Sequence, residues 1–186
     1  MKPISPQLRL KIVLAPIDFS TCSLKAIEYA VALSEHFGAD LSLLHVVQPY
    51  LPSGDISMDL ARAQLDLEKE AQKELDHLKG QVKLACRAVV RAGSPVREIV
   101  REAAEIGADL IVIGTHGRGA FSHLVVGSVA ERVVRAAPCP VLVVREKERD
   151  FIEAQQPACS SARKTRLAPR QNAPIKKKRR QYESMS

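Results

Sequence analysis

The segment from Gly114 to Ser128 combines residue types and spacings that suit phosphate binding. Its glycines and final serine follow the pattern G-x2-G-x9-G-[ST], at Gly114, Gly117, Gly127 and Ser128. Phosphate oxygens need several backbone N–H donors at close range, which glycine permits because it has no Cβ and tolerates positive φ. A helix N-terminus adds unpaired N–H groups and a favourable dipole. The pattern predicts a phosphate-binding loop; in the alternative, its glycines serve only turns and packing.

Several polar side chains near this segment have two interpretations each. Asp18 follows a predicted strand, where a carboxylate can accept hydrogen bonds from a ribose or an adenine amine, or can cap the next helix. Arg118 can donate to a phosphate, or can be a solvated loop charge. His116 lies inside the loop without an identifiable partner, so a metal or catalytic role is its less favoured interpretation. His45 and His123 are interpreted as structural.

No catalytic constellation can be argued from the sequence. A Ser-His-Asp or Cys-His arrangement would have to be assembled from positions without independent support, and no general base is identified. Hydrolysis of a bound nucleotide would then be slow and would depend on water held beside it. The four cysteines (Cys22, Cys86, Cys139 and Cys159) match neither a zinc pattern nor a dense disulfide framework, so free thiols are expected.

Strands and helices are predicted to alternate along the chain. Helix signals include Ser20 as an N-cap, Gly38 as a stop, and Ser94 as an N-cap before Pro95 in a first helical turn. Apolar runs predict strands over 11–17, 40–47, 83–90, 109–113 and 141–144. Helical periodicity and the end signals predict helices over 24–37, 57–79, from 94–95 to 106, and 128–137.

This alternation predicts an α/β fold. Adjacent parallel strands need right-handed helical crossovers, so the economical architecture is a doubly wound five-stranded parallel sheet with helices on both faces, as in Rossmann-like folds. The strand over 83–90 is expected nearer an edge. Ligands of such sheets bind beyond the carboxyl ends of the strands, which here are Asp18, the segment 45–48, and Gly114 onward.

Four separated motifs resemble the universal stress protein family over roughly residues 9–145. They are Gly114 to Ser128, Ala15-Pro-Ile-Asp-Phe-Ser20, Leu43-Leu-His-Val46, and Pro138-Cys-Pro-Val-Leu-Val-Val144. The resemblance implies an adenine-nucleotide-binding fold, of the adenine nucleotide alpha hydrolase-like type, that is usually a homodimer. The family divides into members that bind ATP and members that lack the glycine signature. This sequence keeps every element of the signature.

The resemblance also implies residue roles. Asp18 would hydrogen-bond the nucleoside, and the backbone of Val46 would meet adenine. Ribose and phosphates would be held by Gly114, Gly117, Gly127, Ser128 and Val129, and we include Pro16, His116 and Arg118 among the candidate binding residues. The implied ligand is ATP or another adenine nucleotide, with Mg²⁺ or Mn²⁺ bridging its phosphates.

The net charge of +7 belongs almost wholly to the end of the chain. Residues 1–145 hold 17 lysines and arginines against 16 acidic residues, whereas residues 146–186 hold 11 against 5. We therefore divide the chain into an arm over 1–8, a universal stress protein domain over 9–145, and a basic tail over 146–186. The tail has no apolar periodicity and is predicted to be disordered.

Three functions are compatible with these features. The first is an ATP-binding regulatory or stress-response protein that dimerises through the edge strand Val141 to Val144. The second is a slow ATPase that uses the same loop. The third is a nucleic-acid-binding accessory protein, because Lys176 to Arg180 can bind nucleic acid, an anionic membrane surface or an acidic partner, although this block can also be part of a solubilising tail. No run of apolar residues is long enough to span a membrane, and the N-terminus has no apolar signal core, so a cytoplasmic protein is expected.

Overall fold

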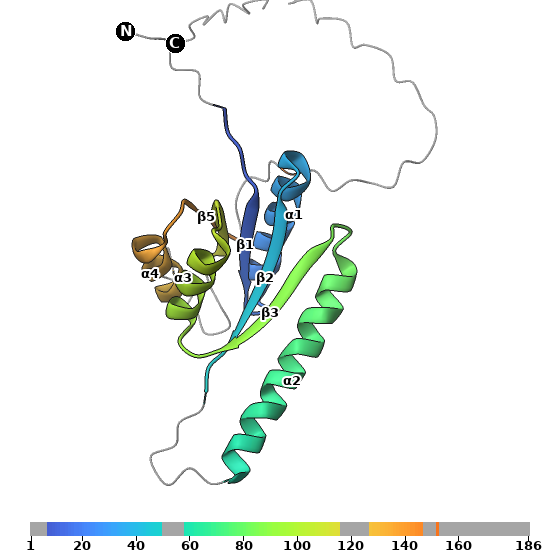
Figure 1. Ribbon diagram of the computed structural model, residues 1–186, viewed down its shortest axis with the longest axis vertical. Coiled ribbons are helices and arrows are strands. Elements are labelled where there is room, and N and C mark those ends of the chain that lie inside the picture. The colour runs from blue at the N-terminus through green and yellow to red at the C-terminus, as the bar shows by residue number, and fades with distance from the viewer. Residues whose placement is uncertain (1–6, 50–57, 116–126, 147–151, 153–186) are drawn as a thin grey trace, which may run out of the picture. The chain divides into compact units, whose positions relative to one another are not determined.

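The computed structural model describes residues 7–49, 58–115, 127–146 and 152. Strands and helices alternate along it (Figure 1). The strands are β1 (Ile12–Ile17), β2 (Asp40–Val47), β3 (Cys86–Ala92), β4 (Leu110–Gly114) and β5 (Val141–Val144), and the helices are α1 (Thr21–Phe37), α2 (Met58–Gln81), α3 (Pro95–Ile106) and α4 (Ser128–Ala136).

The five strands form one parallel sheet in the order β3-β2-β1-β4-β5. From β1 the chain moves outward through β2 to β3, and it then returns to the other side of β1 for β4 and β5. The strand order therefore reverses between β1 and β4, and β3 and β5 are the two edges. The predicted doubly wound five-stranded sheet is confirmed.

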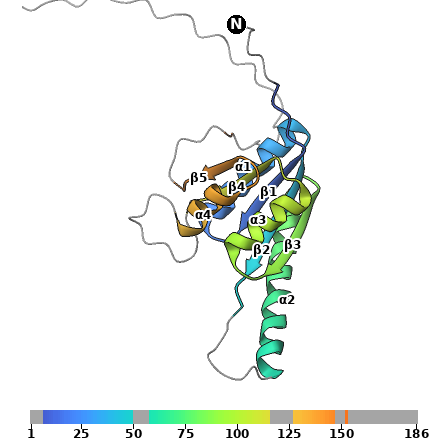
Figure 2. The same ribbon diagram turned by 60° about the vertical axis from the view of Figure 1, so that its left-hand side comes forward.

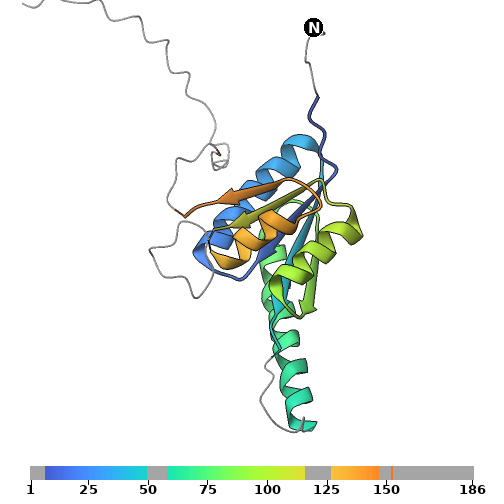
Figure 3. The same cartoon turned by 90° about the vertical axis from the view of Figure 1, so that its left-hand side faces the viewer.

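Two hydrophobic clusters cover the two faces of the sheet. Alternate residues of β1 show the division, because Val13 and Ala15 pack with α1 and α2, whereas Leu14 packs with Ile99 of α3 and Val133 of α4. In Figure 1 the sheet separates α3 and α4 from α1 and α2, and Figures 2 and 3 show α3 and α4 together on one face. Such alternation follows from the two-residue period of a strand that is buried on both sides.

The helix ends follow local sequence signals, with one difference. Ser20 is the N-cap of α1 and its side chain accepts a hydrogen bond from the backbone N–H of Ser23, while Gly38 ends that helix in a left-handed conformation. Ser94 occupies the N-cap position of α3, but its side chain makes no capping hydrogen bond. The prediction of the cap position was right, and the prediction that Ser94 acts as a cap was wrong.

The third strand begins later than predicted, at Cys86 instead of residue 83. Its register with β2 runs from Leu41 opposite Cys86 to Val47 opposite Ala92. Leu84, which suggested an earlier start, instead packs against the cluster on the α1 and α2 face. Its apolar character reflects burial outside the sheet, which a hydrophobicity pattern does not distinguish from a strand.

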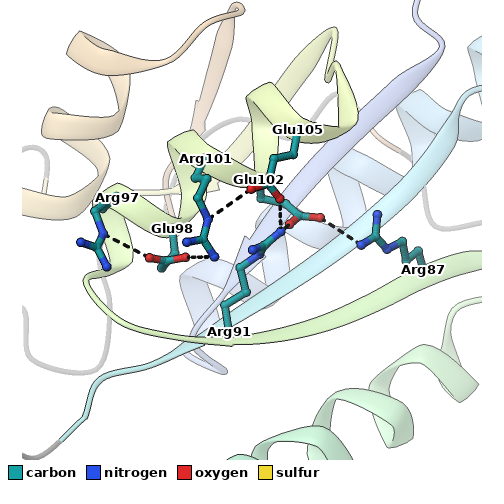
Figure 4. Close-up of polar contacts among 7 residues, drawn as sticks. All are labelled: Arg87, Arg91, Arg97, Glu98, Arg101, Glu102 and Glu105. Carbon is teal, nitrogen blue, oxygen red and sulfur yellow. Dashed lines mark hydrogen bonds and ion pairs between the residues drawn. The ribbon is translucent and has the colours of Figure 1, made fainter.

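An ion-pair cluster joins α3 to β3 (Figure 4). The side chains of Glu98 and Glu102 are fully buried, and Glu102 pairs with Arg91 and with Arg87 on β3. Glu98 pairs with Arg101 at 2.7 Å. Buried carboxylates are tolerated only when they are paired. The pairs of Glu102 link α3 to the edge strand, whereas the pair of Glu98 lies within α3. The remaining members of the cluster are Arg97, which pairs with Glu98, and Glu105, which pairs with Arg91 and Arg101.

Within the described part of the chain, none of the helices is both long and apolar enough to cross a membrane. The predicted basic tail from residue 146 lies almost wholly outside the described residues, and so does the arm that precedes residue 7. The disorder of the tail therefore stays a prediction.

Candidate functional site

Three neighbouring strand ends meet at the carboxyl edge of the sheet. β1 lies between β2 and β4, and Ile17 at its end pairs with His45. Continuing the register between β1 and β4 brings Gly114 level with Ile17. Asp18, Val46 and Gly114 are therefore gathered at the position where the strand order reverses, as the ligand rule for doubly wound sheets predicts.

Asp18 holds the turn that starts α1. One oxygen of its half-buried carboxylate, Oδ1, accepts hydrogen bonds from the backbone N–H of Ser20 at 3.1 Å and from the Ser20 hydroxyl at 2.6 Å. The Ser20 hydroxyl in turn accepts from the Ser23 N–H at 3.2 Å. Asp18 is thus not the N-cap itself but supports the residue that is. Its ligand role stays a prediction.

Gly114 allows α1 to approach the end of β4. A Cβ at this position would lie 2.9 Å from the carbonyl carbon and oxygen of Cys22, in the first turn of α1. Real Cβ atoms do not tolerate such contacts, so a larger residue would push the helix away. Packing was the alternative interpretation of the loop glycines. Gly114 has this packing role, with or without a second role in ligand binding.

Thr115 closes the base of the segment 116–126. Its carbonyl accepts a hydrogen bond of 2.6 Å from the N–H of Gly127, and its own N–H donates to Val144 at 2.8 Å. The hydroxyl is buried and lies 3.4 Å from the Cys22 sulfur, which also donates to the Val144 carbonyl. The two ends of the segment are therefore fixed to each other and to β5.

The N-terminus of α4 begins at Gly127, which can supply no side-chain cap. Gly127 has extended backbone angles, φ −69° and ψ 153°, and makes no side-chain capping bond. Ser128 is exposed and Val129 is half-buried. The first N–H groups of a helix lack intrahelical partners, so this helix start has the donors that an anion requires.

The remaining candidates divide into described and undescribed residues. Pro16 is buried in β1, and Val46 is half-buried on the face covered by α3 and α4. His116, Gly117 and Arg118 lie in the segment 116–126, outside the described residues, as does His123. Their roles stay predictions that rest on the motif.

Two features at this edge were not predicted. Phe19 adopts a left-handed backbone conformation, and its ring packs on His45, whose Nδ1 lies 2.8 Å from the Ile17 carbonyl oxygen. The contact confirms the structural interpretation of His45. The second feature is the bonding of Thr115 and Cys22 described above. The motif pattern does not specify Thr115 or Cys22, because both act through neighbours distant in the sequence.

The described cysteines are not poised for nucleophilic chemistry. Cys22, Cys86 and Cys139 are free, as predicted. Burial raises the pKa of the Cys86 and Cys139 thiols, and both stand at or near the amino ends of strands, away from the carboxyl edge. A raised pKa keeps a thiol protonated and therefore poorly nucleophilic near neutral pH.

Comparison with known proteins gives a consistent family. The family model of the universal stress protein family matches residues 9–145. A universal stress protein of Methanocaldococcus jannaschii is 34% identical over 145 residues, which cover 75% of this chain and 85% of that protein. The solved universal stress protein of Lactobacillus plantarum is 26% identical with a TM-score of 0.62, covering 75% of this chain and all of the other.

Two further solved structures share the fold and contain nucleotides. One is a universal stress protein in complex with cAMP (22% identity, TM-score 0.57), and the other is the universal stress protein of Archaeoglobus fulgidus in complex with dAMP (22% identity, TM-score 0.52). In each comparison the match covers about three quarters of this chain and almost all of the other protein. On its family match and its relatives, this chain belongs to the universal stress protein family.

Proposed function

We propose that this protein binds ATP, or another adenine nucleotide, at the carboxyl edge of its sheet and acts as a regulatory stress-response protein in the cytoplasm. The observation that carries the proposal is the gathering of Asp18, Val46 and Gly114 at neighbouring strand ends, opposite a helix that starts without a side-chain cap. The cAMP and dAMP complexes of proteins with this fold support an adenine nucleotide as the ligand.

The nucleoside half of the ligand is assigned to the ends of β1 and β2. Asp18 is half-buried, and a carboxylate there can accept hydrogen bonds from ribose hydroxyls or from the adenine amine. The backbone of Val46 at the end of β2 would contact the base, and Pro16 lies in the adjacent strand. This assignment follows the family motif and is supported by the register of the two strands.

The phosphate half is assigned to the start of α4 and the segment before it. The N–H groups of Ser128 and Val129 belong to the first helical turn, whose dipole favours negative charge. Gly114, Gly117 and Gly127 would let the backbone approach the phosphates, and the motif adds His116 and Arg118. A cation such as Mg²⁺ or Mn²⁺ would be bound chiefly by the phosphate oxygens, which are hard ligands of the kind that such ions prefer.

A nucleotide holder fits this site better than a dedicated catalyst. Asp18 is held in place by two hydrogen bonds from Ser20 to one carboxylate oxygen, which suits a fixed binding group. A slow ATPase is the second candidate, and it would be recognised by a side-chain substitution that abolishes turnover while leaving nucleotide affinity intact. A third role, nucleic-acid binding through Lys176 to Arg180, would weaken steeply with salt and disappear when residues 146–186 are removed.

Dimerisation is proposed through β5. This edge strand consists of valines and leucine only, and its first three residues are half-buried. An apolar edge with unpaired backbone groups is a template for pairing with a second copy. Leu142→Lys places a charge in the middle of this edge, so a dimer in sedimentation experiments should become a monomer. A wild-type monomer would contradict the proposal.

The nucleotide proposal is tested by purifying the full chain under native conditions and identifying the nucleotide that accompanies it by mass spectrometry. The experiment is repeated with Gly117→Val and Gly127→Val together. Gly127 has backbone angles that any residue can adopt, so a valine there is compatible with the observed backbone conformation. Gly80→Ala, in an open position of α2, is the matched control. Unchanged nucleotide content in the double variant would refute the loop assignment.

A further inference from the structure

Phe19 has an unusual backbone conformation. Among the described residues it is the one non-glycine residue with a positive φ, at 61°. A bulky L side chain adopts this left-handed region only at an energetic cost, which a glycine would not incur. Phe19 also lies between Asp18 and Ser20, which are joined by two hydrogen bonds. The strained residue therefore stands inside the turn that presents Asp18.

The ring of Phe19 joins the ends of two strands. It packs on the ring of His45 with centroids 4.9 Å apart and the planes tilted by 46°. His45 is the last residue before Val46, and its Nδ1 lies 2.8 Å from the carbonyl oxygen of Ile17. The end of β2 is thus held to the end of β1 by a ring contact and by a hydrogen bond, immediately beside both residues assigned to the nucleoside.

We propose that Phe19 is a positioning residue for the base of the nucleotide. Its ring, held against His45 by the left-handed turn, fixes the spacing between Asp18 and the backbone of Val46. This inference rests on the proposed nucleotide site and adds a residue that sets the selectivity of that site for a purine. Strained backbone persists where surrounding contacts determine it, and it gathers at functional sites.

Phe37 provides an internal control for this inference. It is the last residue of α1, whereas Phe19 lies two residues before the first. The ring of Phe37 also contacts a histidine, His36, with centroids 4.8 Å apart. Both phenylalanines pack against the cluster on the α1 and α2 face. Phe37, however, has ordinary helical geometry and stands at the opposite end of the helix. Removing either ring costs packing, but only Phe19 adjoins the proposed site.

The experiment compares ATP and CTP binding by calorimetry for the wild-type chain and the Phe19→Leu, Phe19→Tyr and Phe37→Leu variants. In Phe19→Leu, ATP affinity and the ratio of ATP to CTP affinity should each fall roughly tenfold, equivalent to about 1.4 kcal/mol. Phe19→Tyr keeps the ring and should restore the wild-type ratio. Phe37→Leu should lower the melting temperature about as much as Phe19→Leu does, but it should leave the ratio of ATP to CTP affinity unchanged.

His45→Gln tests the same contact from its other side and should reduce the ATP to CTP ratio as Phe19→Leu does, which keeps the inference testable should Phe19→Leu fold poorly. An unchanged ratio in both variants, or an equal loss of ATP and CTP affinity, would overturn the positioning role while leaving the nucleotide site intact. A wild-type chain that binds neither nucleotide would overturn the proposed function itself, and this inference with it.

Discussion

The starts of α1 and α4 lie at the same edge of the sheet but are completed in different ways. The first turn of α1 is capped by a side chain of the protein itself. The Ser20 hydroxyl accepts a hydrogen bond from the Ser23 N–H, and Asp18 in turn accepts from Ser20. The first turn of α4 starts at a glycine without a side chain. Donors satisfied by the protein stabilise the fold, whereas donors left for another partner can bind a ligand. The difference supports the proposal that phosphate binds at the start of α4 and not at the start of α1.

The largest loss of stability is expected when the close approach of α1 is blocked. In Gly114→Ala the new Cβ would meet the Cys22 carbonyl at 2.9 Å, so α1 must shift, and the free energy of unfolding should fall by about 1–3 kcal/mol. Gly80→Ala makes the same chemical change in open space inside α2 and should instead raise it by about 0.5–1 kcal/mol. Urea denaturation measures both. Equal effects of the two substitutions would show that the start of α1 is not tightly filled.

A smaller loss is expected at the opposite end of the sheet, where Asp109 also satisfies backbone donors. Its Oδ2 accepts from the N–H groups of Lys11 at 2.7 Å and Ile12 at 3.0 Å. Asp109→Asn should lower the free energy of unfolding by about 1–2 kcal/mol at neutral pH, because hydrogen bonds to a charged acceptor are lost. Nucleotide affinity should not change, since this end of the sheet is remote from the proposed site.

The loss at Asp109 should depend on pH. Hydrogen bonds from the backbone N–H groups of Lys11 and then Ile12 hold the pKa of Asp109 below its ordinary value of 3.8. A carboxylate with a lowered folded-state pKa stabilises the protein above its unfolded pKa and loses that contribution as the pH falls through the folded value. The difference between wild type and Asp109→Asn should therefore be constant above about pH 5 and should shrink below pH 3.8. A difference that grows on acidification would contradict this assignment.

The smallest of these losses is expected from the α1 cap. Ser20→Ala removes the hydroxyl that accepts from the Ser23 N–H, and thermal unfolding should report a loss of about 1 kcal/mol. Ser20→Thr keeps a capping hydroxyl and is the matched control. A Ser20→Ala protein as stable as wild type would show that this hydroxyl does not cap α1, which would remove the distinction between the two helix starts.

Much of the architecture could be predicted from the sequence because its signals are local. The apolar runs of β1 and β4 and the glycine after α1 depend on residues close together in the chain, and each was placed within about a residue of its observed position. The start of β3 was placed too early because Leu84 is partly buried without belonging to the sheet. Hydrophobicity reports burial, and it does not report which neighbour causes it.

The candidate site could be located from the sequence only in outline. The rule for strand ends brought Asp18, Val46 and Gly114 together before the register was known. The packing of Gly114 on Cys22, the closure of the segment 116–126 by Thr115, and the conformation of Phe19 all depend on contacts between residues distant in the sequence. Such contacts leave no periodic pattern that could have predicted them.

The most direct test of the account is to give α4 a side-chain cap of its own. Asp or Asn at an N-cap is as good as or better than glycine, so Gly127→Asp should leave the free energy of unfolding equal to or a few tenths of a kcal/mol above wild type. Its carboxylate would occupy the helix start and repel phosphate, so ATP affinity should fall at least roughly a hundredfold, about 2.7 kcal/mol. Gly127→Asn, an uncharged cap of the same shape, should lose less. A Gly127→Asp protein that binds ATP as tightly as wild type would contradict the assignment of phosphate to α4.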